Sequence, residues 1–156
     1  MFNLEVPCPC GSGNSYKECC SPLHKGEAAK NALQLMRSRY TAFALNLPDY
    51  IIKTTHPASP QYIENKTQWK QKISDMAEHS LFQGLDILEF KEKGTLATVS
   101  FTCHLMQGQE NATFTEKSYF ELFHGRWLYR AGQFKEANDP TILLSHELNL
   151  LPLAYY

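Results

Sequence analysis

Four cysteines near the start of the chain have the residue type and the spacing of a metal site. Cys8, Cys10, Cys19 and Cys20 lie in the segment PCPCGSGNSYKECC and follow the pattern C-x-C, eight residues, then C-C. Thiolate is a soft ligand that suits Zn²⁺, and four thiolates complete a closed tetrahedral site. Because no position is left for water or substrate, the sequence predicts a structural zinc site rather than a catalytic one.

The residues around these cysteines suit the same chemistry. Gly11 and Gly13 can adopt positive φ, which turns backbone amides toward the sulfur atoms. Lys17 can offset part of the negative charge that four thiolates leave on one Zn²⁺. His24 follows Cys20 closely enough to be the alternative fourth ligand, although we expect Cys20 to hold that position.

Disulfides are the other explanation for clustered cysteines. A bridge between Cys19 and Cys20 would close a strained ring, and one between Cys8 and Cys10 would be nearly as cramped. Cross-pairing is geometrically possible but suits a secreted chain, and the segment MFNLEVPCPC lacks the basic start and the apolar stretch of a signal peptide. We therefore expect a cytoplasmic protein whose reduced thiols bind metal.

Composition indicates one ordinary domain with a small appendage. The chain has 156 residues, of which 43% are hydrophobic and 12% are aromatic, and this is enough for a packed core. The formal net charge of −1 disfavours a protein that binds nucleic acid through bulk charge. No apolar run reaches the ~18 residues of a membrane-spanning helix.

The segment CPCGSGNSYKECC resembles the SEC-C motif, a small zinc module found at the C-terminus of the SecA translocation ATPase and in many unrelated bacterial proteins. The match includes the Gly-Ser-Gly turn and the Tyr-Lys pair before the last two cysteines. In the SecA version the final ligand is histidine, and here Cys20 occupies that place. The resemblance implies zinc held by Cys8, Cys10, Cys19 and Cys20, and a role in contacts between proteins.

The pattern becomes helical from Glu27 onward. A short helix is expected to begin at Asp49 and to end before Pro57, and another is expected over residues 67–79, with Gly84 as its stop. Before these, EAAKNALQLMRSRYTAFALN has the apolar stripe of an amphipathic helix, at Ala29, Leu33, Met36, Tyr40, Phe43 and Leu47.

The second half of the chain alternates apolar and polar residues with the period of β-strands. The segment TLATVSFTCHLM places one face at Ala97, Val99, Phe101, Cys103 and Leu105. His124 and Gly125 are expected to form a tight turn between TFTEKSYFELF and RWLYRAG. Helices followed by antiparallel strands indicate an α+β fold, with the helices covering one side of the sheet.

Counting outward from this turn predicts which residues face each other, namely Leu122 and Trp127, Phe120 and Tyr129, Ser118 and Ala131, and Glu116 and Gln133. The opposite face should be largely exposed, and it would carry Lys117, Tyr119, Glu121, Arg126 and Arg130. A slip of one residue would exchange the two faces, and histidine is not the best first residue for such a turn.

A second resemblance covers nearly the whole chain. The segments LMRSRYTAF, THP and EKSYFELFHGRWLYRAG look like the corresponding blocks of the bacterial YchJ-type proteins, which also begin with a SEC-C motif. Residues at the family's spacing are Glu116, Ser118, Phe120, Gly125, Trp127, Tyr129 and Gly132. The resemblance implies a nuclear transport factor 2-like body, in which helices close a strongly bent antiparallel sheet into a cone. We accordingly expect a SEC-C zinc-binding module over residues 1–26 and this α+β domain over residues 27–156.

A cone of this kind can enclose a pocket, and the residues expected near its wall are Arg39, Tyr40, His56, Glu116, Ser118, Trp127 and Tyr129. Glu116 in an apolar cavity, or His56 near neutral pH, could serve as a general acid or base. The alternative is a structural network in which Glu116 pairs with Arg37 or Arg39. We favour the network, so no catalytic residue is assigned.

The sequence favours an adaptor, in which the zinc module docks on another protein and the body binds a peptide or a small apolar ligand. Lys17, His24 and Lys25 would give the module a modest basic face suited to acidic protein surfaces. Contact with nucleic acid or the ribosome through these basic residues is a lesser alternative.

Two other functions are compatible with the sequence. The cone could bind a small molecule or act on it as an enzyme, or the zinc could serve only to pin the N-terminus to the body. A homodimer is a further expectation, because sheets of this type often pair through an exposed face, here at Thr98, Ser100, Thr102 and His104.

Overall fold

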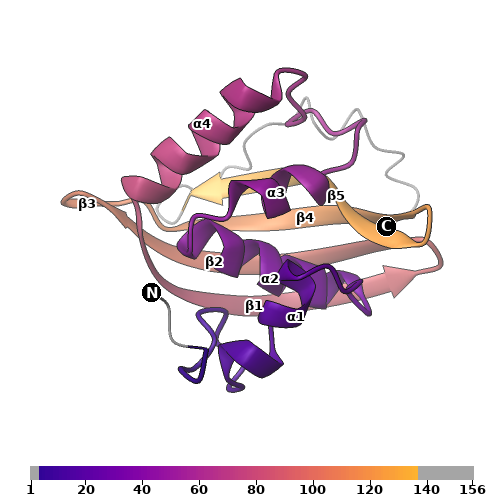
Figure 1. Cartoon of the computed structure of the whole chain (residues 1–156), viewed down its shortest axis with the longest axis horizontal. Helices are drawn as coiled ribbons and strands as arrows, with labels where there is room; N and C mark the ends of the chain where they lie inside the picture. The colour runs from indigo at the N-terminus through magenta and orange to yellow at the C-terminus, as the bar shows by residue number, and fades with distance from the viewer. Residues whose placement is uncertain (1–3, 137–156) are drawn as a thin grey trace.

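The protein has an α+β architecture in which helices cover one face of a bent antiparallel sheet (Figure 1). The computed structural model describes residues 4–136. The cysteine-rich segment lies at the lower edge of this arrangement, beside α1 and α2 (Figure 1). The predicted fold class is therefore confirmed.

The sheet has the strand order β1-β2-β4-β5, and all neighbours are antiparallel. Its strands are β1 (Leu81–Lys93), β2 (Leu96–Gln107), β4 (Phe114–Phe123) and β5 (Arg126–Glu136), and the short β3 (Glu110–Asn111) pairs with the end of β2. The alternation predicted for β2 is confirmed, because every second residue from Ala97 to Leu105 is buried.

The helices are η1 (Tyr16–Glu18), α1 (Ser21–His24), α2 (Ala32–Ala44), α3 (Pro48–Lys53) and α4 (Lys66–Glu78). Asparagine begins both long helices, since the side chains of Asn31 and Asn65 accept hydrogen bonds from the backbone amides of Gln34 and Gln68. No helix within residues 4–136 is long and apolar enough to cross a membrane.

Gly84 lies inside β1, so the expectation that it stops the preceding helix is wrong. Helix α4 ends at Glu78, and Gly84 pairs with His104 in the sheet. The register shifts between Phe82 and Gly84, which marks a β-bulge. Glycine is common at such irregularities because it adapts its backbone at little steric cost, so here it signals a bend in a strand.

Helix α2 is the centre of the core. It contacts β1, β2 and β5 of the sheet, α1 of the N-terminal module, and helices α3 and α4. Buried residues therefore lie around much of its circumference, at Ala32, Leu35, Met36, Ser38, Arg39, Tyr40, Thr41 and Ala42. The single apolar stripe predicted for this helix is too narrow, because the module and the sheet cover different sides of it.

The β4–β5 hairpin follows the predicted register near its turn. His124 and Gly125 have φ of 50° and 81°, as the tightest hairpin turns require. The pairs Leu122–Trp127 and Phe120–Tyr129 are confirmed.

The register changes farther from the turn. A shift between Tyr119 and Phe120 leaves Arg130 as an extra residue in β5. Ser118 consequently faces Gly132, and Glu116 faces Phe134, so the predicted partners Ala131 and Gln133 are wrong. A bulge cannot be seen in a simple count from the turn, since it adds one residue to one strand only.

The convex face of the sheet is less exposed than predicted. Tyr119 and Ala131 are buried there, and so is Thr98, which pairs with Tyr119. Thr98 is therefore not available for the predicted contact between two copies of the chain. Ser100, Thr102 and His104 are each at least partly exposed, and the homodimer stays a prediction.

The outer edge of β5 is partly covered by the chain that follows α3. The amide of Tyr129 donates to the carbonyl of Thr54, and the amide of His56 donates to the carbonyl of Tyr129, each at 2.8 Å. Thr55 forms an isolated parallel bridge with Tyr129 between these two bonds. The middle of this edge strand thus has hydrogen-bond partners on both sides.

Candidate functional site

The sulfur atoms of Cys8, Cys10, Cys19 and Cys20 all lie within 4.8 Å of one another. A short hairpin brings them together, in which the amide of Cys8 donates to the carbonyl of Asn14 at 2.8 Å. Gly11 and Gly13 have the positive φ that the sequence predicted for this turn. All four thiols are free, and a group of four soft donors at these distances fits a metal ion.

The cluster is largely closed to solvent. Cys8, Cys10 and Cys20 are buried, and Cys19 is partly exposed with its sulfur 3.1 Å from the hydroxyl of Ser12. Burial raises the pKa of Cys19 to about 11, and the neighbouring thiolate of Cys10 also raises it. A divalent cation reverses this electrostatic cost, because it stabilises the deprotonated thiols that repel one another in its absence.

His24 lies outside the sulfur cluster and fixes the module to α2. Its Nε2 donates to the carbonyl of Ser38 at 2.9 Å, so its Nδ1 accepts from the hydroxyl of Tyr16 at 2.7 Å. The ring also packs edge-on against Tyr50, with centroids 4.6 Å apart. Both ring nitrogens are thus engaged, and Cys20 is the fourth member of the cluster.

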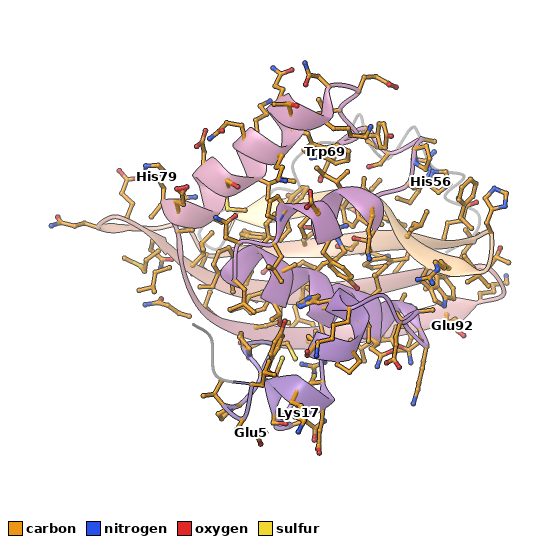
Figure 2. The ribbon with its side chains drawn as sticks, in the orientation of Figure 1. Glu5, Lys17, His56, Trp69, His79 and Glu92 are labelled. Atoms are coloured by element: carbon orange, nitrogen blue, oxygen red, sulfur yellow. The ribbon has the colours of Figure 1, made fainter. Side chains whose placement is uncertain are left out.

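The positive charge beside the cluster comes from Arg37 of α2. Its Nη1 donates to the carbonyl of Cys10 at 2.8 Å and lies 3.9 Å from the sulfur of that residue. Lys17, which we expected to supply this charge, instead pairs with Glu5 at 3.7 Å. Both of these side chains are exposed on the outer surface of the module (Figure 2). The polar contacts of Arg37 are with Cys10 of the module, so it is not the arginine of the predicted network with Glu116.

A cavity of about 230 Å³ lies between α2 and the concave face of the sheet. Its wall is mostly aromatic and aliphatic, and it is formed by Met36, Arg39, Tyr40, Phe43, Gln61, Met76, Phe82, Phe101, Cys103, Leu105, Phe114, Glu116, Ser118, Phe120, Tyr129 and Phe134. The cavity therefore combines a large apolar wall with a few polar groups, which is typical of sites for small molecules.

The polar groups of the cavity are connected to one another. The hydroxyl groups of Ser118 and Tyr129 both donate to Oε2 of Glu116, the latter at 2.8 Å. The hydroxyl oxygen of Tyr129 accepts from Nε2 of Gln61 at 3.0 Å. Glu116, Ser118 and Tyr129 are buried, whereas Gln61 is exposed, so this polar cluster runs from the cavity toward solvent.

Arg39 is buried against the ring of Tyr129. Its Nη1 donates to the hydroxyls of Thr54 and Thr55, at 2.7 and 3.2 Å, and its guanidinium carbon lies 4.6 Å from the ring centroid of Tyr129. Burial lowers the pKa of Arg39, and the negative charge of Glu116 offsets part of this effect. Tyr129 thus connects the two residues of the predicted network, because its ring packs against the guanidinium group of Arg39 and its hydroxyl donates to the carboxylate of Glu116.

Five of the seven predicted pocket residues line the cavity, namely Arg39, Tyr40, Glu116, Ser118 and Tyr129. Trp127 instead lines a separate hollow beside the segment that follows the metal module. Sequence reasoning missed Gln61 and Phe134. Gln61 lies in a loop without a periodic pattern, and Phe134 reaches the concave face only because of the bulge in β5.

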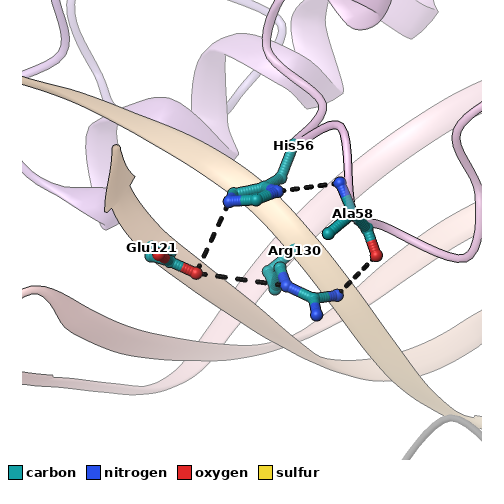
Figure 3. Close-up of polar contacts among 4 residues, drawn as sticks. All are labelled: His56, Ala58, Glu121 and Arg130. Carbon is teal, nitrogen blue, oxygen red and sulfur yellow. Dashed lines mark hydrogen bonds and ion pairs between the residues drawn. The ribbon is translucent and has the colours of Figure 1, made fainter. Parts of the chain in front are cut away.

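His56, the remaining predicted pocket residue, lies away from the cavity and connects a loop to the hairpin (Figure 3). Its Nδ1 accepts from the amide of Ala58 at 2.9 Å, and its Nε2 lies 3.5 Å from Oε1 of Glu121. Arg130 completes the cluster by donating to the carbonyl of Ala58 at 2.9 Å. The arrangement suits neutral His56, because a proton on Nδ1 would point at the N–H of Ala58, which is also a donor.

Comparison with known proteins yields two family models. The model described as YchJ, middle NTF2-like domain, matches residues 31–132, and the model of the SEC-C motif matches residues 6–22. A UPF0225 protein of Shewanella sp. (strain MR-4) is 37% identical over 151 residues, which cover 86% of this chain and 88% of that protein.

Two solved structures of SEC-C motif containing proteins are also similar. The solution structure of one from Rhodopseudomonas palustris has a TM-score of 0.69 at 36% identity, and the match covers 80% of this chain and 95% of that one. The crystal structure of one from Psychrobacter arcticus has a TM-score of 0.68 at 26% identity, covering 90% and 85% of the two chains.

Replacing Gly132 by alanine tests the packing around Glu116. A Cβ at this position would overlap Oε2 of Glu116 and the hydroxyl of Tyr129, so we expect Gly132→Ala to lower the free energy of unfolding by about 1–3 kcal/mol. In the control Gly84→Ala, the new Cβ meets only Cδ2 of His104 at 3.8 Å, and the change should stay within about 0.5 kcal/mol. Denaturant unfolding measures both, and equal losses would contradict this account.

The pH dependence of stability tests the environment of His56. Burial lowers the pKa of His56, and nearby Arg130 lowers it further, while Glu121 offsets part of the effect. The unfolded chain therefore binds more protons than the folded one below about pH 6.5, and His56 should make the protein less stable as the pH falls through this range. In His56→Gln, which cannot titrate, the loss of stability between about pH 8 and pH 5 should be smaller. An unchanged pH profile would be evidence against this role.

Proposed function

The chain belongs to the family that joins a SEC-C motif to the NTF2-like middle domain of YchJ, and we propose that it is a zinc-stabilised protein whose cavity binds a small molecule. The metal has a structural role in this proposal. Function resides in the cavity between α2 and the sheet, and the metal module holds one wall of that cavity in place.

The observation that carries the proposal is that α2 serves both sites. Arg37 and Thr41, one turn apart, face the sulfur cluster, where the hydroxyl of Thr41 lies 3.7 Å from the sulfur of Cys8. Met36, Tyr40 and Phe43 lie on another side of the same helix and line the cavity. An ion that fixes the module on α2 therefore also fixes the position of these three side chains.

Zinc is the metal that we propose for the cluster. Four thiolates form the donor set that Zn²⁺ prefers in closed structural sites, and Cys8, Cys10, Cys19 and Cys20 would hold it. When bound, the ion stabilises the thiolates and ties together two ends of a segment too short to form its own core. The free thiols of the cluster suit the reducing cytoplasm, where we place the protein.

We propose binding rather than catalysis in the cavity. Oε2 of Glu116 already accepts hydrogen bonds from two buried hydroxyl groups, Ser118 and Tyr129. A carboxylate stabilised in this way is a poor base, because proton uptake would weaken both bonds. The arrangement instead supports a role for the Glu116 carboxylate as a fixed hydrogen-bond acceptor for a ligand.

A second candidate is the adaptor function, in which the outer surface of the module contacts another protein. Leu4 is 38% exposed there, close to the exposed pair of Glu5 and Lys17. Of the three residues predicted to form a basic face, Lys25 is exposed, Lys17 is paired with Glu5, and the ring of His24 contacts Ser38 and Tyr16. An apolar residue beside charges of both signs suits a protein partner better than nucleic acid.

Metal removal tests the proposed role of the ion. We expect one zinc per chain in the purified protein, and chelation should lower the melting temperature of the whole domain by about 5 °C or more, because the module and α2 share one core. Cys10→Ser should behave like the chelated protein, whereas Cys103→Ala, a buried cysteine outside the cluster, should keep its zinc. Metal analysis and calorimetry measure these effects. Protein without stoichiometric metal would overturn the proposal.

A surface variant tests the adaptor function. A protein partner isolated with the full chain should be lost with the double variant Leu4→Ser and Lys17→Glu, while the zinc content of the chain stays unchanged. The control Glu92→Lys alters an exposed residue of β1 far from the module and should retain the partner (Figure 2). If the double variant still binds the same partner, the contact is made elsewhere.

A further inference from the structure

The wall of the cavity between α2 and the sheet has two parts of different chemistry. Aromatic rings dominate the larger part, among them Tyr40, Phe82, Phe101 and Phe120. Ser118 and Glu116 lie together in the smaller, polar part. A ligand that fits this cavity must be mainly apolar and must have a polar group at one end.

The hydrogen bonds of the polar part determine what that group must be. The hydroxyl protons of Ser118 and Tyr129 are both donated to Oε2 of Glu116, and an amide proton of Gln61 is donated to Tyr129. With its proton used in this way, the hydroxyl oxygen of Ser118 presents lone pairs, and the carboxylate of Glu116 is an acceptor. The end of the cavity formed by Ser118 and Glu116 therefore offers acceptors, and the complementary ligand group at this end is a hydrogen-bond donor.

Charge restricts the ligand further. Arg39 and Glu116 have opposite charges, and both belong to the wall of the cavity. The guanidinium group of Arg39 donates to the neutral hydroxyls of Thr54 and Thr55. A charged ligand would add an unbalanced charge beside the buried side chains of Arg39 and Glu116, which is costly. A neutral ligand leaves the balance between Arg39 and Glu116 unchanged.

From these observations we propose that the cavity holds a small, neutral aromatic or alicyclic molecule with one hydroxyl or N–H group, which donates a hydrogen bond to the pair formed by Ser118 and Glu116. This inference rests on the proposed function, since it names the ligand class of the same cavity. The volume of about 230 Å³ is below the roughly 300–1,000 Å³ of typical ligand sites and restricts the ligand to one or two rings.

Three probes of similar shape test the ligand class with the full-length chain. Indole has an N–H donor, indene has the same ring frame without a donor, and indole carboxylate adds a negative charge. We expect indole to bind about three- to tenfold more tightly than indene, the ratio that one ordinary hydrogen bond provides. Indole carboxylate should bind more weakly than either. Calorimetry or ligand-observed NMR measures all three affinities.

Serine variants place the hydrogen bond. In Ser118→Ala the preference for indole over indene should disappear, while the affinity for indene is retained. Ser100→Ala makes the same change on the convex face of the sheet and should alter neither affinity. Glu116→Gln is a second test that preserves the shape of the side chain, and it should also reduce the preference for indole. Circular dichroism shows whether each variant is folded.

The outcomes separate this inference from the proposed function. If none of the probes binds, small-molecule binding in the cavity is overturned. If indene binds as tightly as indole, the cavity binds ligands but the requirement for a donor is wrong. Tighter binding of indole carboxylate would overturn the requirement for a neutral ligand, and a preference for indole that persists in Ser118→Ala would show that the donor lies elsewhere.

Discussion

The contact between the sulfur cluster and α2 is the constraint on which the rest of the molecule depends. The cysteine-rich segment is too short to bury a hydrophobic core of its own. Cys8, Cys10, Cys20 and Leu23 instead belong to the same buried cluster as the apolar residues of α2 and the sheet. Arg37 and His24 add direct hydrogen bonds across this junction. The N-terminal segment is thus a part of the core that α2 and the sheet also form.

Sequence reasoning succeeded where a pattern is local and repeated. The spacing of the four cysteines was sufficient to group them, and the alternation in β2 identified the concave face of the sheet. The pairs next to the His124–Gly125 turn followed from counting alone. Each of these features depends on residues close together in the chain, so the sequence contains the information directly.

The expectations that failed depend on contacts between distant segments. Because Arg130 is an extra residue in β5, Gly132 lies on the concave face where Ala131 was expected. The alternation of apolar and polar residues in the sequence does not indicate this bulge. His56 was expected in the cavity but lies beside Glu121, because the backbone bonds between its loop and Tyr129 hold it there. Arg37, and not Lys17, lies beside the cysteines, because α2 packs on the module. Tertiary packing determines the positions of these residues.

The backbone bridge between the loop after α3 and strand β5 has a consequence for the behaviour of the protein in solution. An edge strand has unpaired backbone amides and carbonyls, which can form hydrogen bonds with a strand of another chain and so start aggregation. Thr54 and His56 already use the outward-facing backbone groups of Tyr129, and Thr55 lies between them. The loop therefore protects the middle of this edge strand from edge-to-edge pairing with another chain, in addition to the charged residues Arg126 and Arg130 of the strand itself.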